Sequence, residues 1–480
     1  MWIVSILSKL LKFLKRDYLT KPHKVFLCTS LLFGILIVFL TPPFQGPDET
    51  VHFFRSVQIS NFDMSVNKKG NVAGGNVDTA YAKLVKLTHD DPGIAFQPDK
   101  TMPLSALEKG NDLDLSHKSI FVDFGSTATN PPIAYLPSAV FIKIGTLIGF
   151  GPLSIFYLAR IGGLLAWAII TYYAIKIIPG QKWALVIANF IPMLLFQAGM
   201  VTADSLTFAL LSLFVAEIIH LRVKEDPVSR NDWIRLIIII AIMSISKRLM
   251  FFFSPLIFLV RPYKKVAITR FVQALVTVLS IPFSMGWAQL MRSELGSKIL
   301  VGGDANPTAQ INFLKGSPIA VARVTFNTYF STTSDWIIHS IFGVFGSMDT
   351  PLPIWIVIIS SFITLIAITR QDPIIKNTIE QKENIKLKRW EKLLVFSICA
   401  SYFMAVNLAL YVYYTPPKFA TYYGVQGRYF LPILITLILF FVGTKYEGKN
   451  SIMTQRRLVL VSELILIASL STLFLRYYVI

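Results

Sequence analysis

The chain has 480 residues, of which 54% are hydrophobic and only 15% are charged. Soluble domains carry about 25% charged residues, so this composition excludes an ordinary soluble protein and predicts a surface that faces lipid. The formal net charge is +19, but the basic residues stand in short clusters between apolar runs. Such clusters set the orientation of membrane helices, so we expect the lipid bilayer, and no nucleic acid, as the partner.

The apolar runs predict an all-α polytopic membrane protein of about 11 transmembrane helices, each built from roughly 20 apolar residues. The Lys and Arg bias places the N-terminus inside and the C-terminus outside. The expected parts, in chain order, are a basic cytoplasmic tail (1–23), a first transmembrane helix (24–41), a large extracytoplasmic loop with interfacial helices (42–154), transmembrane helices 2–7 (155–290), a second extracytoplasmic loop (291–351) and transmembrane helices 8–11 (352–480).

Segment 131–150 decides the orientation of everything that follows it. If this segment crossed the bilayer, the basic linker 222–235 would lie outside. If it lies in the outer interface, the later basic linkers fall inside, as the positive-inside rule favours. We therefore expect an interfacial helix here, with a full crossing as the alternative, and we expect a re-entrant piece at 336–347.

The apolar run 234–260 contains Lys247 and Arg248 near its middle. One continuous helix would put both cations at mid-bilayer, at a cost of several kcal/mol. Two short spans that meet at the outer face avoid this cost. The two cations then meet a lipid phosphate or diphosphate, or they snorkel to ordinary headgroups.

A group of charged residues follows the first predicted helix, which three prolines end. Asp48, Glu49, His52 and Arg55 recur there at helical spacing. A carboxylate held on a rigid turn at the membrane surface could act as a general base for an acceptor hydroxyl, or as a metal ligand. The alternative is a helix cap with a solvated charge cluster.

Other candidate residues lie at predicted span ends on the same outer side. Asp204 stands between two spans, where it either caps a helix or joins Asp48. Arg428 opens a late span, and its planar guanidinium suits phosphate oxygens, with a snorkelling anchor in the aromatic belt as the alternative. Candidate substrate-binding residues from neighbouring polar segments are Asn130, Tyr135, Gln426 and Tyr429, together with His52 and Arg55.

The sequence contains no Walker A loop, no Rossmann glycine signature and no zinc-type cluster of Cys and His. We therefore expect no nucleotide cofactor. The candidate carboxylates are too few to fix the coordination shell of a divalent metal ion, so a metal is left open.

Five short motifs follow one another along the chain: Pro-Asp-Glu-x-x-His-x-x-Arg, Asn-Pro-Pro-x-x-Tyr-Leu-Pro, Thr-Ala-Asp-Ser, Ser-Lys at a span junction, and Gln-Gly-Arg-Tyr-Phe-Leu-Pro. With these motifs the chain resembles, over nearly its whole length, a bacterial family of predicted membrane proteins with a domain of unknown function. That family is in turn similar to GT-C-type glycosyltransferases, which use polyprenyl-phosphate sugars. The resemblance implies a GT-C-like fold in the bacterial cytoplasmic membrane and an active site on its extracytoplasmic face.

The resemblance also implies roles for individual residues. Asp48, with Glu49 beside it, and Asp204 would be the catalytic or metal-associated carboxylates. Lys247, followed by Arg248, and Arg428 would contact the lipid phosphate. Lys247 is followed by Arg248-Leu249 and not by the Gly-Pro or Pro of many relatives, so no proline marks a helix break at this point.

The function implied by the resemblance is sugar transfer from a polyprenyl-phosphate donor to a cell-envelope glycan or glycolipid. An oxocarbenium-like transition state, which carboxylates stabilise, fits the candidate acids. A glycolipid or polysaccharide transporter, flippase or polymerase of the same pathway is the alternative, although its charges would be spread along the spans. A scaffold or receptor that uses the long loop is a third hypothesis.

Overall fold

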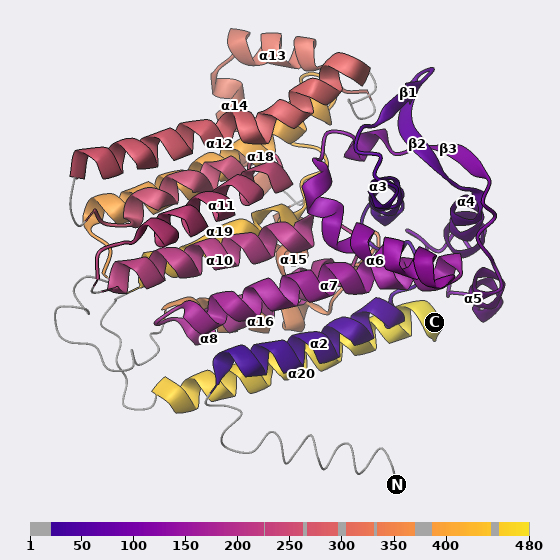
Figure 1. The fold of residues 1–480 in the computed structure, drawn as a ribbon, viewed down its shortest axis with the longest axis horizontal. Helices are drawn as coiled ribbons and strands as arrows, with labels where there is room; N and C mark the ends of the chain where they lie inside the picture. Colours follow the sequence, from indigo (N-terminus) through magenta and orange to yellow (C-terminus); the bar gives the residue numbers. More distant parts are fainter. Residues whose placement is uncertain are drawn as a thin grey trace.

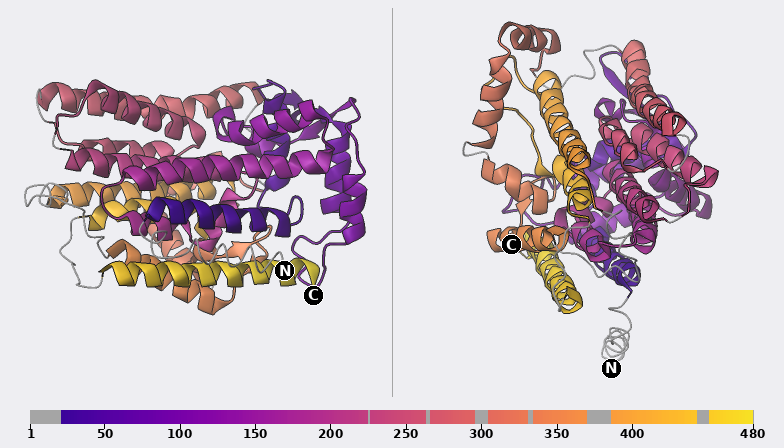
Figure 2. Two further views of the ribbon diagram at one scale, coloured as in Figure 1. Left: turned by 60° about the horizontal axis from the view of Figure 1, so that its bottom comes forward. Right: turned by 90° about the vertical axis from the view of Figure 1, so that its left-hand side faces the viewer.

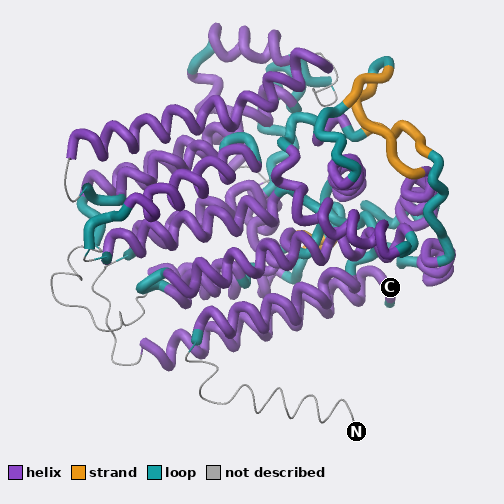
Figure 3. The backbone as a smooth tube through the Cα atoms, in the orientation of Figure 1, coloured by secondary structure: helices purple, strands orange, loops and turns teal. Residues whose placement is uncertain are grey.

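The computed structural model describes residues 21–479, except residue 225 and segments 263–265, 296–303, 331–333, 370–385 and 443–450. Nearly all of the predicted basic tail therefore lies outside the described residues. Most of the described chain is helical, and the long helices run side by side as one bundle (Figure 1). Residues 42–148 form an outer layer of short helices and strands at one end of this bundle (Figures 1 and 3).

The helices of the bundle fall into two length classes. The long helices are α2 (Pro22–Leu40), α7 (Pro152–Ile177), α10 (Asp204–Val223), α12 (Val266–Leu295), α18 (Arg389–Tyr413) and α20 (Ser451–Tyr478). The shorter helices are α8 (Lys182–Asn189), α9 (Pro192–Ala198), α11 (Arg230–Ser246), η5 (Met250–Leu259), α16 (Ile354–Thr369), η7 (Gly427–Phe430) and α19 (Leu431–Phe441).

The remaining elements lie in the two connecting regions. The outer layer contains α3 (Glu49–Ser60), β1 (Asn67–Lys69), β2 (Val72–Asp78), α4 (Thr79–Val85), η2 (Lys86–Asp90), α5 (Leu104–Asn111), β3 (Ser119–Asp123), η3 (Gly125–Thr127), η4 (Pro132–Tyr135) and α6 (Leu136–Ile148). Between α12 and α16 stand α13 (Pro307–Gly316), α14 (Ile319–Tyr329), α15 (Ser334–Phe342), β4 (Val344–Phe345) and β5 (Thr350–Pro351).

Within the described residues, six helices are long and apolar enough to cross a membrane, namely the six long helices above. Burial separates them into central and peripheral helices. In the most apolar stretch of α10, 83% of the residues are buried, whereas in α12 only 11% are. Because a helix that exposes apolar side chains needs an apolar solvent, α12 faces lipid and α10 forms the centre of the bundle.

The outer layer is built on a three-stranded antiparallel sheet in the order β1-β2-β3. Gly74 of β2 pairs with Asp123 of β3, and a Cβ at Gly74 would lie 1.7 Å from the Val122 carbonyl oxygen, so only glycine fits there. Aromatic side chains, among them Phe44, Phe53 and Phe156, pack beneath the layer and join it to α7.

Segment 131–150, which decides the expected topology, forms η4 and α6. The 13 residues of α6 rise about 20 Å, less than the roughly 30 Å of a bilayer core. The helix packs closely on α7. Gly162 of α7 permits this approach, because a Cβ there would lie 2.6 Å from the Pro137 carbonyl oxygen. Together with η4, α6 forms one apolar helical segment, Pro132–Ile148, which is shorter than each of the six long helices.

The apolar run 234–260 is broken into α11 and η5, as the buried-charge argument predicts. Lys247 is extended, with φ −151° and ψ 137°, and Leu249 adopts a left-handed conformation with φ 71°. The break therefore forms without a proline at the junction. Segment 183–199 forms two helices, α8 and α9. Segment 336–347, where a re-entrant piece is expected, forms most of α15 followed by β4.

The end of α20 holds one edge of the outer layer. The guanidinium of Arg476 donates hydrogen bonds to the carbonyl oxygens of Ile94 and Lys100, each at 2.7 Å. The Met102 amide donates to the Tyr477 carbonyl oxygen at 2.8 Å. The last helix of the chain thus fastens a loop that belongs to the first connecting region (Figure 2).

Candidate functional site

Four charged side chains from distant parts of the sequence meet where the bundle joins the outer layer. Asp48 precedes α3, Asp204 begins α10, Lys247 follows α11 and Arg428 lies in η7. We name these four residues the charged cluster. From the sequence, each of them is expected at a span end on one face, and the structure brings all four together.

Asp48 has an unusual backbone conformation. It lies in the left-handed region, with φ 55° and ψ 20°, and its side chain makes no capping hydrogen bond to α3. Its carboxylate is 64% exposed and accepts a hydrogen bond from Nη2 of Arg428 at 3.2 Å. The helix-cap alternative for Asp48 is therefore wrong. A non-glycine residue held in this conformation is typical of functional sites.

Asp204 is the buried member of the charged cluster. One carboxylate oxygen accepts a hydrogen bond from Nζ of Lys247, and the other lies 3.7 Å from Nη1 of Arg428. Its side chain points to these cations and not to the amides of α10, so capping is not its role. Burial of a carboxylate is costly unless cations and hydrogen bonds compensate it, and here two cations do so.

Arg428 lies between the two carboxylates because η7 is held against α15. The Gly427 amide donates to Oγ of Ser340 at 2.6 Å, and a Cβ at Gly427 would lie 2.3 Å from the Ile337 carbonyl oxygen. Only glycine permits this approach. Gln426 then accepts a hydrogen bond from Nε of Arg428 at 2.6 Å and fixes the plane of the guanidinium.

A neutral hydrogen-bonded chain approaches the charged cluster from the outer layer. Nδ2 of Asn130 donates to the Tyr135 hydroxyl at 3.0 Å, and that hydroxyl lies 2.7 Å from Nδ1 of His52. We assign the Tyr135 hydrogen to this second bond, which leaves the N–H of His52 on Nε2. Burial lowers the pKa of His52 to about 4, although the nearby carboxylates of Asp48 and Asp204 oppose this shift.

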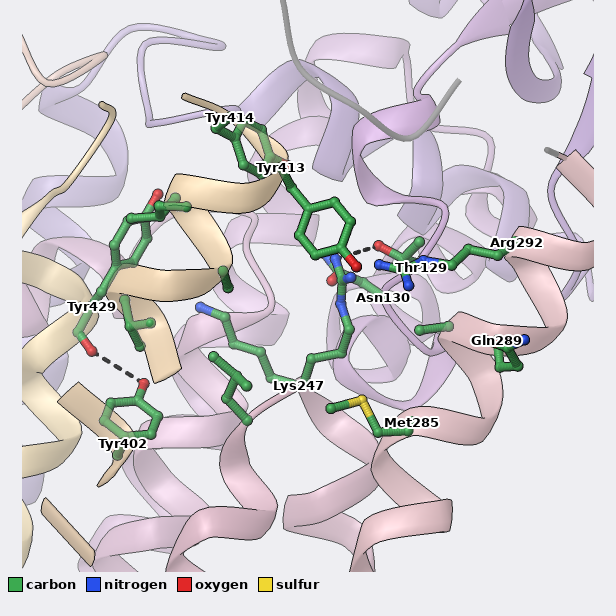
Figure 4. Close-up of a pocket in the computed structure, with 16 residues that line it drawn as sticks. Thr129, Asn130, Lys247, Met285, Gln289, Arg292, Tyr402, Tyr413, Tyr414 and Tyr429 are labelled. Carbon is green, nitrogen blue, oxygen red and sulfur yellow. Dashed lines mark hydrogen bonds between the residues drawn. The ribbon is translucent and has the colours of Figure 1, made fainter. Parts of the chain in front are cut away.

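A cavity of about 340 Å³ opens beside the charged cluster (Figure 4). Three cations line it: Lys247, Arg248 and Arg292. Figure 4 shows Lys247 between the tyrosines of α18 and η7 on one side and Arg292 of α12 on the other. The other lining residues are Thr129, Asn130, Leu249, Met285, Ala288, Gln289, Tyr402, Val406, Ala409, Leu410, Tyr413, Tyr414 and Tyr429.

The charges around this cavity do not balance. Lys247 and Arg428 are matched by the two carboxylates of the charged cluster. Arg248 donates to Oγ1 of Thr129 at 2.5 Å, and the guanidinium of Arg292 lies 4.7 Å from the Tyr413 ring centroid. In the part of the chain that the structure describes, neither guanidinium forms an ion pair with a carboxylate. The cavity therefore favours an anionic ligand.

A family model for predicted membrane proteins, DUF2142, matches residues 31–437. The chain belongs to this family. The matched region contains every residue of the charged cluster and every residue that lines the cavity. No curated protein and no solved structure matches the chain.

Two predicted site residues of this DUF2142 protein lie away from the charged cluster. Glu49 is buried and accepts hydrogen bonds from Nε and Nη2 of Arg160 at 2.8 and 2.7 Å. The amides of Gly46 and Val201 also donate to it, each at 3.0 Å. Arg55 donates to the Met64 carbonyl oxygen at 2.7 Å, inside the outer layer. Both residues hold elements together.

A divalent metal ion, which the sequence leaves open, does not fit the donor set of the charged cluster. Mg²⁺ and Ca²⁺ need several oxygen ligands around one point. Here the guanidinium of Arg428 occupies the place between the carboxylates of Asp48 and Asp204. Among the described residues, no three side chains of His, Cys, Asp or Glu gather at one place.

Sequence reasoning missed several contributors to the site. Arg160 lies in the region predicted to hold transmembrane helices 2–7 (155–290), where an intramembrane arginine is expected to be paired or functional. Arg292 lies two residues beyond the end of that region and has no motif around it. Gln197, whose Oε1 accepts from Arg428 at 3.3 Å, lies in an apolar run with no other signal.

Proposed function

We propose that this protein is a GT-C-type membrane glycosyltransferase. It transfers a sugar from a polyprenyl-phosphate donor to a glycan or glycolipid of the bacterial cell envelope. The observation that carries the proposal is the charge arrangement: two carboxylates held by two cations at the rim of a cavity whose two further guanidiniums have no carboxylate partner among the described residues.

The proposed chemistry uses the exposed and the buried carboxylate differently. The bond between the anomeric carbon and the phosphate oxygen breaks, and the lipid phosphate leaves with the electron pair. The acceptor hydroxyl oxygen bonds to the anomeric carbon, and its proton passes to Asp48, which is exposed and reachable. Asp204, kept in place by Lys247, stabilises the positive charge that develops on the sugar ring.

The cations of the cavity have the complementary task. Charge grows on the phosphate oxygens as the sugar leaves, and guanidiniums that already point at this position stabilise it without further reorganisation. Arg248 and Arg292 serve this purpose, because no described carboxylate neutralises them. Lys247 contacts Asp204 and also lies 5.8 Å from the Tyr429 ring centroid, at the boundary between the sugar and phosphate positions.

The proposal includes the expected topology of about 11 crossings, with the N-terminus inside and the outer layer outside. The crossing elements are α2, α7, the pair α8–α9, α10, α11, η5, α12, α16, α18, the pair η7–α19, and α20. Support comes from the charges at the end of the bundle opposite the site. Lys224 and Arg235 lie there and pair with Asp232, as expected for a cytoplasmic linker.

The experiment that tests the function is sugar transfer by purified protein in liposomes. Undecaprenyl-phosphate hexoses serve as donors, and envelope glycan from cells without the protein serves as acceptor. Asp48→Asn and Asp204→Asn should each lower the rate by about 10²- to 10⁴-fold, the usual contribution of a catalytic acid or base. Asp99→Asn, an exposed carboxylate of the outer layer, is the matched control and should keep the wild-type rate.

Wild-type transfer rates in both carboxylate variants would remove Asp48 and Asp204 from the mechanism. The same liposomes also test the transport alternative. Movement of the intact glycolipid across the bilayer, with no change to the acceptor glycan, would replace the transferase proposal with a flippase.

A further inference from the structure

A second cavity lies deeper in the bundle, on the same side as the first. It measures about 230 Å³ and is lined by apolar and small side chains of three elements. Thr277 and Ile281 come from α12, Ser397 and Ser401 from α18, and Pro255 from η5. None of the described residues that line it is charged. This composition suits a hydrocarbon chain and not a polar ligand.

The residues that line the two cavities lie along one face of α12 and along one face of α18. On α12, Thr277 and Ile281 line the deep cavity, and Met285, Ala288 and Arg292 line the outer one, all at spacings of three or four residues. About one helical turn separates the cavities there. Both α12 and α18 pack on η5, which forms the floor.

The lining residues of α18 are arranged in the same way. Leu394, Ile398 and Ser401 face the deep cavity, and the next residue, Tyr402, already faces the outer one. Ala409 and Tyr413 continue that face to the outer end. We give the name α12–α18 seam to these two neighbouring cavities between α12, η5 and α18, together with the residues that line them.

The α12–α18 seam is open to lipid along its side. Ile281 is 43% exposed and Met285 is 39% exposed, although both line the cavities. In a bilayer these exposed apolar atoms meet hydrocarbon. A chain can therefore enter the seam sideways from the membrane and need not thread through a tunnel.

The length of the α12–α18 seam can be compared with the depth of one leaflet of a bilayer. From Arg292 to Thr277 the helix rises about 22 Å. One leaflet of a bilayer has a hydrocarbon depth of about 15 Å, half of the roughly 30 Å core. A seam that begins at the phosphate-binding end and continues for this distance is longer than the hydrocarbon depth of one leaflet.

We propose that the α12–α18 seam binds the hydrocarbon chain of a long-chain lipid phosphate, with the phosphate held between Arg248 and Arg292. The seam selects the carrier lipid by chain length, and the two guanidiniums select the phosphate. This inference rests on the proposed function only for the choice of a lipid phosphate as the ligand. It adds that a chain longer than one leaflet is needed for full affinity.

The test measures binding without sugar transfer. Purified protein in phosphatidylcholine nanodiscs is titrated with undecaprenyl phosphate, geranyl phosphate and dioleoyl phosphatidic acid, each displacing a fluorescent prenyl phosphate. The wild type should bind undecaprenyl phosphate at least about tenfold more tightly than either shorter lipid, a difference of about 1.4 kcal/mol.

Two variants separate the chain site from the phosphate site. Ser401→Trp fills the deep cavity and should weaken undecaprenyl phosphate about tenfold while geranyl phosphate keeps its affinity. Arg292→Gln should weaken both by a similar factor, because both carry the phosphate. Ser401→Ala and Leu393→Trp are the controls: the first keeps the cavity, and the second adds the same indole on an exposed position of α18 that lines neither cavity.

Equal wild-type affinities for the three lipids would overturn the proposal, as would equal weakening of both prenyl phosphates by Ser401→Trp. The outcome is independent of catalysis. Chain-length-dependent binding in a protein that transfers no sugar would leave the α12–α18 seam in place and refute the transferase. Active sugar transfer with no dependence of binding on chain length would support the transferase and refute the α12–α18 seam as the chain site.

Discussion

The guanidinium of Arg428 contacts a carboxylate that lies 380 residues away in the sequence. It reaches Asp48 through Nη2 and approaches Asp204 through Nη1, while Gln426 holds its Nε. All three nitrogen atoms of the guanidinium therefore have partners. A lysine at this position offers a single ammonium and cannot contact two carboxylates in the same plane.

Arg428→Lys should therefore lower sugar transfer by about 10- to 100-fold, because one carboxylate loses the cation that positions it. The rate is measured in the liposome assay described above. Arg323→Lys, an exposed arginine on α14, makes the same chemical change away from the site and should have no effect. An unchanged rate in Arg428→Lys would show that bidentate geometry is not needed.

His52 makes the stability of the folded protein around the site depend on pH. Burial lowers its pKa to about 4, against about 6.5 when exposed, so the folded protein binds this proton less readily than the unfolded chain does. Neutral His52 makes its full contribution to the stability of the folded protein above pH 6.5, and this contribution is lost as the pH falls toward 4. Its size is on the order of 3 kcal/mol.

Hydrogen exchange of the α3 amides between pH 4 and pH 7 measures this effect, after correction for intrinsic exchange. In the wild type, the free energy of local opening should fall with acidification. In His52→Gln, which keeps a polar partner for Tyr135 but does not titrate there, the fall should be smaller. Identical pH dependence in the two proteins would contradict the assignment of the effect to His52.

At the residue scale, the sequence was informative where a charge interrupts an apolar run. Asp204, Lys247 and Arg428 all stand out for that reason, since a charge near the membrane needs a partner or a function. Arg292 does not stand out, because an arginine just past the end of a span is ordinary. Its importance comes only from the approach of α12 to α18, a non-local contact that no local pattern encodes.

At the scale of elements, the Glu49–Arg160 pair connects α3 to α7. Arg160 also donates to the carbonyl oxygens of Val38 and Thr41, at 2.7 and 2.6 Å, where α2 ends. Three elements thus share one buried ion pair. This arrangement fixes the turn on which Asp48 lies, next to Glu49 in the chain.

Glu49→Gln should lower the stability of the folded protein by about 3–5 kcal/mol, because it leaves the Arg160 charge buried without its anion. Sugar transfer per folded molecule should stay within about twofold of the wild type, since a residue that only positions a turn contributes less than a catalytic acid or base. Thermal unfolding in detergent and the rate of the folded fraction measure the two effects. Glu108→Gln on α5, an exposed glutamate, is the control. Loss of transfer without loss of stability would return Glu49 to the catalytic group.

Helix ends were more predictable than helix breaks. The predicted first transmembrane helix, 24–41, has its ends within two residues of those of α2, Pro22–Leu40. The break at Leu249 has no such signal in the sequence, since leucine has no preference for the positive φ that it adopts there. The strands of the outer layer were not predicted either. β1 is only Asn67–Lys69, and its pairing with β2 supplies the structure that its own sequence does not.

At the scale of the whole molecule, the proposed topology puts the outer layer and the linker near Asp226 on opposite sides of the membrane. Cysteine labelling of intact cells tests it in a chain whose two cysteines, Cys28 and Cys399, are replaced by serine. Lys69→Cys should react with an impermeant maleimide from outside. Asp226→Cys should react only after permeabilisation. External labelling of Asp226→Cys would show that segment 131–150 crosses the bilayer.

The hydrogen bonds from Arg476 to Ile94 and Lys100 have a consequence for the order in which the protein is completed. The loop around Ile94 leaves the ribosome 382 residues before its partner on α20. At about 5–20 residues per second, this loop waits roughly 20–75 s for its last contacts. The outer layer is thus among the first parts made and among the last to be locked. A protein halted before α20 would carry every residue of the charged cluster with one edge of their covering layer unfastened.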